Sequence, residues 1–110
     1  MTNGDVEMAR MFMKRQPSRL RGGPGQMAQY REMVEQESSP CPEFPDALRQ
    51  FALDALSDED GDWVRRALQA LAVVGDSKDV HSISALKQHS EENVRVDAET
   101  CLFEIKKREQ

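Results

Sequence analysis

The stretch WVRRALQALAVVG, residues 63–75, decides the fold, and it returns 31 positions later as VRVDAETCLFEIK, residues 94–106. The corresponding residues recur at i, i+4, i+7, i+8 and i+11, a spacing that places side chains on one face of an α-helix. A repeat of roughly thirty residues indicates one supersecondary unit stacked on its copy. The paired positions expected in the buried stripe are Trp63 and Val94, Ala67 and Ala98, Ala70 and Cys101, Leu71 and Leu102, and Val74 and Ile105.

The composition favours helices that pack through alanine and leucine, because charged residues make up 32% of the 110 residues and aromatic residues only 5%. No apolar stretch reaches the roughly eighteen residues that cross a bilayer. The N-terminus also lacks the apolar run of a secretory signal. We therefore expect a cytoplasmic protein without a membrane partner, in which Cys41 and Cys101 stay reduced.

The rest of the sequence predicts helices and loops, since no segment alternates with a period of two. Residues 17–25 contain three glycines and two prolines and predict a loop, and residues 38–45 predict a proline-stiffened connection. Gly75 is expected to end one helix in the left-handed conformation, and Asp76 or Ser77 to cap the next. Helices are expected at residues 5–16, 26–37, 46–56, 62–74, 78–89 and 91–107.

Residues 46–106 resemble two HEAT repeats of the short type found in phycobilisome-lyase-like proteins. The residues that carry the resemblance are DWVRRALQALAVVGD, 62–76, and ENVRVDAETCLFEI, 92–105. The family pattern runs from an acidic turn through Val-Arg, paired alanines, Ala-Leu and an aliphatic residue to Gly-Asp. Trp63 stands where valine is usual, and Lys106 replaces the closing glycine. The resemblance implies an all-α fold, a small right-handed α-solenoid of helical hairpins.

Three parts are predicted along the chain. Residues 1–37 form a basic, Met-rich N-terminal cap or arm, residues 38–45 a Pro-rich connection, and residues 46–110 the two repeats. Two repeats fall below the three or so that are usually needed for stability, so the cap, or a second copy in a homodimer, must supply the missing neighbour. The residues expected either to pack the cap or to form a docking surface are Met8, Met11, Phe12, Met27, Tyr30 and Met33.

Charge is distributed unevenly. Residues 1–31 carry six basic and two acidic side chains, whereas residues 32–110 carry nine basic and eighteen acidic ones. The acidic body should repel nucleic acid, because such binding depends on neutralising phosphates. The alternative function is a nucleic-acid-associated protein that uses the basic N-terminal arm, with the residues Arg10, Lys14, Arg15, Arg19 and Arg21.

HEAT solenoids line their inner surface with the second helix of each pair, and this implies a set of partner-binding residues here. In the first copy they are Arg66, Gln69 and Val73, and 31 residues later they are Asp97, Thr100 and Glu104. Phe103 follows the stripe residue Leu102 and is expected to reach the same surface. The set forms either a mixed-charge recognition patch or an ordinary solvated face.

No motif predicts catalysis, a cofactor or a metal site. The acidic turn at residues 58–62 has its glycine at the wrong place for a calcium-binding EF-hand loop. His81 and His89 lie eight residues apart, with no cysteine or carboxylate at zinc-ligand spacing. The segment GGPG at residues 22–25 lacks the lysine and hydroxyl of a phosphate-binding loop.

The sequence therefore predicts a non-catalytic module that binds another protein, as an adaptor, a regulator or an inhibitor of the immunity-protein kind. Binding is expected to use the second-helix face together with Arg15, Arg19 and Arg21 of the N-terminal arm. On this interpretation we do not expect the protein to bind nucleic acid.

Overall fold

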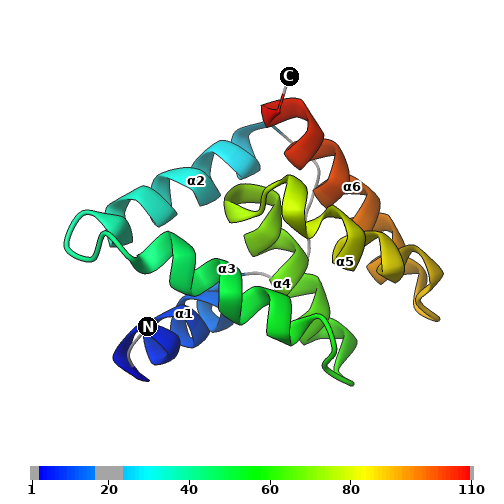
Figure 1. The fold of residues 1–110 in the computed structure, drawn as a ribbon, viewed down its shortest axis with the longest axis horizontal. Coiled ribbons are helices and arrows are strands. Elements are labelled where there is room, and N and C mark those ends of the chain that lie inside the picture. Colours follow the sequence, from blue (N-terminus) through cyan, green and yellow to red (C-terminus); the bar gives the residue numbers. More distant parts are fainter. Residues whose placement is uncertain (1–2, 17–23, 110) are drawn as a thin grey trace.

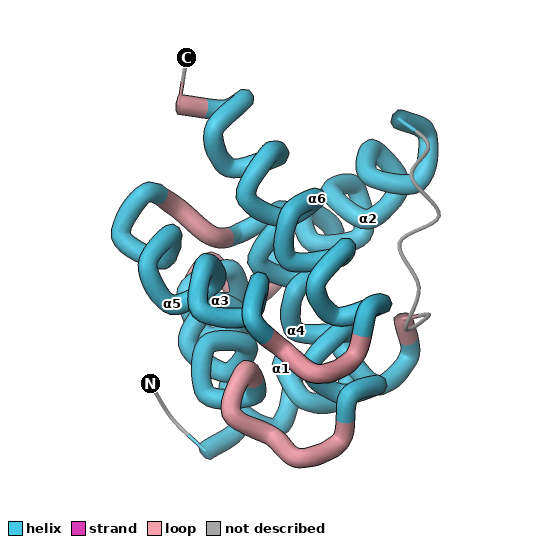
Figure 2. The backbone as a smooth tube through the Cα atoms, turned by 90° about the vertical axis from the view of Figure 1, so that its right-hand side faces the viewer, coloured by secondary structure: helices cyan, strands magenta, loops and turns pink. Residues whose placement is uncertain are grey.

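The computed structural model describes residues 3–16 and 24–109, and within these ranges the chain forms only helices, turns and loops (Figures 1 and 2). The prediction of an all-α fold is confirmed. None of the helices in these ranges is long and apolar enough to span a bilayer. The elements are α1 (Asn3–Arg15), α2 (Pro24–Ser38), α3 (Phe44–Ala55), α4 (Gly61–Val74), the 3₁₀ helix η1 (Ser77–Asp79), α5 (Val80–Ser84), the 3₁₀ helix η2 (Ala85–Gln88) and α6 (Glu92–Arg108).

Two of the helices that begin earlier than the sequence suggests have a proline at the start. α2 begins at Pro24, and α3 begins at Phe44 with Pro45 in its first turn. Proline is tolerated there because the first helical amides have no partner inside the helix. The helix expected over residues 78–89 is instead divided into η1, α5 and η2. Its two serines and its β-branched residues favour a continuous α-helix less than alanine or leucine would.

Helix α4 lies in the middle of the molecule, packed between α3 and α6, with further contacts to α1 and α2 (Figure 1). A helix enclosed on so many sides must be apolar around most of its circumference. Alanines at several inward positions let the neighbouring helices approach closely. The buried apolar residues of α4 are Val64, Ala67, Leu68, Ala70, Leu71 and Ala72.

Two of the pairs expected at an interval of 31 residues, Ala67 with Ala98 and Ala70 with Cys101, are fully buried at both positions. The other three expected pairs each contain one half-buried residue: Trp63, Leu102 or Val74. An interval of thirty residues pairs buried residues of α4 and α6 more consistently: Val64 with Val94, Leu68 with Ala98, and Leu71 with Cys101. Trp63 and Val94 do not share an environment, because the Trp63 ring is half-buried and packs edge-on against Phe51 with ring centroids 6.1 Å apart. An indole is too large for the inner position, which the smaller Val64 occupies.

Gly75 does not adopt the left-handed conformation that was expected. Its φ and ψ are −72° and 162°, which is extended backbone open to any residue. The position requires glycine for another reason. A Cβ atom there would lie 2.5 Å from the Leu71 carbonyl oxygen and 3.1 Å from Ile105 Cδ1, so α6 crosses this point against bare backbone. Asp76, one of the two expected caps, accepts a hydrogen bond from the Lys78 amide.

Two arginines hold the C-terminal ends of neighbouring helices. Arg66 of α4 donates hydrogen bonds to the carbonyls of Met13, Lys14 and Gln16 at the end of α1. Arg108 of α6 donates to the carbonyls of Ala72 and Gly75 at the end of α4. The last carbonyls of a helix lack intrahelical partners and carry negative partial charge, so a guanidinium both satisfies and neutralises them.

Two arginine–aspartate pairs connect helices that do not follow each other directly along the chain. Arg49 of α3 donates to both carboxylate oxygens of Asp79, with Nε–Oδ2 and Nη2–Oδ1 distances of 2.8 and 2.6 Å. Arg65 of α4 donates to Asp97 of α6 over 2.7 Å. Both aspartates are buried, so losing either arginine would remove the positively charged partner of a carboxylate in the interior.

The N-terminal helices pack onto this body through aromatic rings. Phe12 of α1 contacts Tyr30 of α2 and Phe44 of α3 edge-on, with centroid distances of 5.5 and 5.2 Å. Met27 is also buried, and Met8 and Met33 are half-buried against the core, as expected of packing residues. Met11 departs from this expectation, because 45% of its surface is exposed.

We predict that Leu71→Ala lowers the free energy of unfolding by about 2–5 kcal/mol, because Leu71 is fully buried and its truncation leaves a cavity. Leu102→Ala should have a smaller effect, since Leu102 is only half-buried, whereas the repeat pattern suggested equal effects. Urea unfolding followed by circular dichroism measures both. Equal losses would mean that the observed register of α6 is wrong.

We also predict that Asp79 makes stability depend on pH. Burial alone would raise the pKa of Asp79, but hydrogen bonds from Arg49 and from the Asp76 amide outweigh it and lower the pKa below its ordinary value. The resulting stabilisation is fully present above the unfolded-state pKa of about 3.9 and is lost as the pH falls through the lower folded value. Unfolding free energies measured between neutral pH and pH 3 should therefore fall more steeply for the wild type than for Asp79→Asn. Equal slopes would contradict this assignment.

Candidate functional site

The outer face of α6 exposes large apolar side chains. Val96 is 52% exposed and Phe103 is 63% exposed, and their separation of seven residues places them on the same side of the helix. The opposite side is buried through Val94, Ala98 and Ile105. Single exposed apolar residues are common, but two that share one helix face beside a pocket indicate a contact surface.

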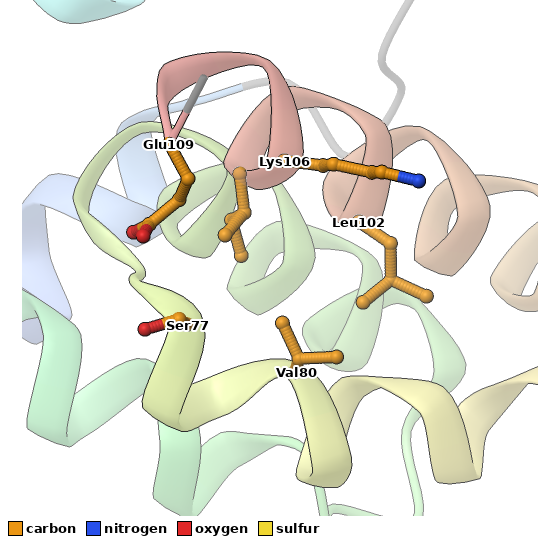
Figure 3. A pocket seen from close by; sticks show the side chains of 6 residues that line it. Ser77, Val80, Leu102, Lys106 and Glu109 are labelled. Carbon is orange, nitrogen blue, oxygen red and sulfur yellow. The ribbon is translucent and has the colours of Figure 1, made fainter.

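An apolar pocket of about 290 Å³ lies next to this face, between the C-terminal half of α6 and the segment formed by η1 and α5. Figure 3 shows Leu102 and Val80 pointing toward each other across it. Charged groups lie at its rim, where the Glu109 carboxylate approaches Ser77 and the Lys106 side chain extends along α6. We call Val96, Phe103 and this pocket the α6 surface; the pocket is lined by Ser77, Val80, Leu102, Ile105, Lys106 and Glu109.

Charge runs along α6 from acidic to basic. Glu91 and Glu92 stand at its start, and Lys106, Lys107 and Arg108 form its last turn. This order complements the helix dipole, which is positive at the N-terminus and negative at the C-terminus. Because Arg108 is bonded to carbonyls at the end of α4, the free positive charge of this end belongs to Lys106 and Lys107.

On α4, the three predicted partner-binding residues do not form an accessible face. Gln69 is only 1% exposed, so its placement on a surface was wrong. Arg66 is occupied at the end of α1, and Val73 is half-buried against the core. The reason is that α1 and α2 pack on this side of α4 and cover the surface that an uncapped repeat would present.

On α6, the predicted residues are divided between interior and surface. Asp97 is 3% exposed and paired with Arg65, so its expected surface placement was also wrong. Thr100 is half-buried and donates its hydroxyl hydrogen to the Val96 carbonyl, and Glu104 is half-buried. Phe103 is exposed, as expected.

The predicted basic arm is described only in part. Arg15 is exposed, and its Nη2 lies 3.5 Å from a carboxylate oxygen of Glu37. Arg10 is paired with Glu7 on its own helix. Arg19 and Arg21 fall outside the described residues. Arg10 and Arg15 thus have acidic neighbours, Lys14 is exposed on α1, and the roles of Arg19 and Arg21 stay predictions.

Sequence reasoning missed Val96 and the pocket. The spacing of Val96 and Phe103 was a readable signal, because seven residues bring side chains to one helix face. The pocket was not readable. It depends on the short α5 segment holding Val80 beside Leu102, two residues that lie 22 positions apart in the sequence.

Within residues 3–16 and 24–109, no group of three His, Cys, Asp or Glu side chains lies together so as to hold a metal ion. In the acidic turn, the Asp58 carboxylate accepts a hydrogen bond from the Asp60 amide, and the Asp60 carboxylate accepts one from the Asp62 amide. The second of these bonds caps the N-terminus of α4. Burial raises the pKa of Cys101 to about 12, so this thiol stays protonated at neutral pH.

A second cavity, of about 260 Å³, lies between α2 and α4 and is lined by Tyr30, Met33 and four glutamines, Gln16, Gln26, Gln29 and Gln69. The buried Tyr30 hydroxyl has no hydrogen-bond partner among the residues that the structure describes, and burial raises its pKa above the ordinary value. A buried hydroxyl without a partner opposes folding, because it gives up its bonds to water.

We therefore predict that Tyr30→Phe leaves the free energy of unfolding unchanged or raises it by up to about 1 kcal/mol. The phenyl ring preserves the edge-on contact with Phe12. Thermal and chemical unfolding of the two proteins provide the comparison. A loss of stability on removing the hydroxyl would show that a bound water or ligand satisfies it.

Comparison of the chain with protein-family models, with curated proteins and with solved structures finds no match.

Proposed function

We propose that this chain is a non-catalytic protein-binding module, built as a small right-handed HEAT-like α-solenoid. In this interpretation residues 46–110 form two repeats, the hairpins of α3 with α4 and of α5 with α6. Residues 1–37 form the cap, joined through residues 38–45. The stacking of α4 between α3 and α6 supports the proposal, since a repeat array buries each hairpin against the next.

The observation that carries the binding role is the α6 surface. Phe103 stands exposed on the outer face, and the apolar pocket between Val80 and Leu102 adjoins it. Aromatic residues beside a well-formed pocket are the usual centre of protein interfaces. Thr100 and Glu104, both half-buried on α6, remain candidates for its edge.

The binding mechanism that we propose is rigid presentation. The pairs Arg49–Asp79 and Arg65–Asp97 fix α5 and α6 relative to the preceding hairpin, so that a partner meets a surface that is already formed. Preorganisation of this kind lowers the entropy lost on association. The module would act as an adaptor, a regulator or an inhibitor. A cytoplasmic location is part of the proposal and suits two free cysteines.

We predict that Phe103→Ser removes binding partners while leaving the fold intact. The immobilised wild type and variant are compared for the proteins that each retains from native lysate, with unchanged thermal unfolding as evidence of folding. Val6→Ser is the matched control, because Val6 is an exposed apolar residue on α1 that belongs neither to the α6 surface nor to the methionine-rich set of the N-terminal cap. The expected result is a set of proteins retained by the wild type and by Val6→Ser but lost from Phe103→Ser. If no retained protein depends on Phe103, the proposed function fails.

A further inference from the structure

We infer that one occupant of the α6 surface is a second copy of the same chain, with the two α6 helices antiparallel across a two-fold axis; this inference rests on the proposed function. A two-fold interface places one patch against itself, so every feature needs its complement on the same patch. The α6 surface meets this requirement in shape and in charge.

The complement in shape is a protruding side chain beside a hollow. Phe103 projects from the outer face of α6, and the pocket lies on the neighbouring side of the same helix, lined by Leu102 and by Val80 of α5. An axis that passes between the two features brings Phe103 of each copy over the pocket of the other. A volume of about 290 Å³ is enough to receive a phenyl ring.

The complement in charge follows from the same axis. If Phe103 lies opposite Leu102 of the second copy, antiparallel helices place Glu99 of each copy opposite Lys106 of the other. Both side chains are exposed, and neither forms an ion pair within the described ranges of its own chain. Each interface therefore gains two identical Glu99–Lys106 contacts, one on each side of the axis. A parallel arrangement would instead bring like charges together.

The size of the surface sets the strength of the association. A helix of 17 residues is about 25 Å long. One such face, with the pocket beside it, provides less than the roughly 800 Å² per partner that is typical of stable complexes. The dimer should therefore be weak and in rapid exchange, and it should appear only as the protein concentration rises.

Sedimentation equilibrium of the purified full chain over a wide range of concentrations tests this inference. The wild type should show a reversible monomer–dimer equilibrium. Phe103→Ser and Lys106→Glu should each weaken dimerisation by about tenfold or more, since each change acts twice in a two-fold interface. Combining Lys106→Glu with Glu99→Lys should restore it, because the opposite charges then face each other again. Lys14→Glu makes the same change of charge at an exposed position of α1, a helix that packs against α3 and α4, and should leave the equilibrium unchanged.

Three results would overturn the inference: a chain that stays monomeric at the highest concentration, a dimer that persists in Phe103→Ser, or a double variant that does not regain association. Thermal unfolding confirms that each variant is folded. A monomeric chain that still retains different proteins from lysate through Phe103 would contradict self-association alone and leave the proposed function standing. A monomeric chain that retains none would contradict both.

Discussion

The enclosure of α4 is the constraint on which the rest of the structure depends. This helix has neighbours on several sides, and even the polar residue Gln69 is buried on it. An enclosed helix can place a charged group only where a partner meets it. Arg65 therefore reaches Asp97, and Arg66 reaches the carbonyls at the end of α1. The ordinary requirement of satisfying polar groups at a crowded helix thus determines where α1 and α6 lie.

The helical class and most element boundaries were predictable from the sequence, because apolar spacing reports directly on which helix face is buried. The register of the repeat was not. Sequence similarity aligned Trp63 with Val94, but size decides which residue fits an inner position, and Val64 rather than Trp63 occupies it. Spacing records the period of a pattern and says little about the volume that each position can hold. Gly75 was likewise recognised as special for the wrong reason, since the Leu71 carbonyl oxygen, 2.5 Å from where a Cβ would lie, is what excludes a side chain, and the nearby Ile105 adds to the crowding.

The candidate site was predicted only in part for a related reason. Gln69 and Asp97 were placed on a surface by analogy with an open repeat array, and α1, α2 and Arg65 cover them instead. Phe103 was placed correctly, because the outer face of the last helix follows from the periodicity of that helix alone. Whether a residue is exposed depends on the helix face on which it lies and on the elements that pack over that face. A single sequence predicts the helix face well, but it does not predict which elements cover it.

Arg108 has a consequence for how α6 behaves as a contact surface. The last turn of a terminal helix ordinarily frays, because its carbonyls and side chains have little to hold them. Here the Arg108 guanidinium in that turn is bonded to the carbonyls of Ala72 and Gly75 at the end of α4, and Arg108 follows Lys106 by two residues and Phe103 by five. Arg108 therefore anchors the turn that carries Phe103 and Lys106. Because the backbone of this turn is already ordered in the folded domain, a molecule that docks there causes little further loss of conformational entropy.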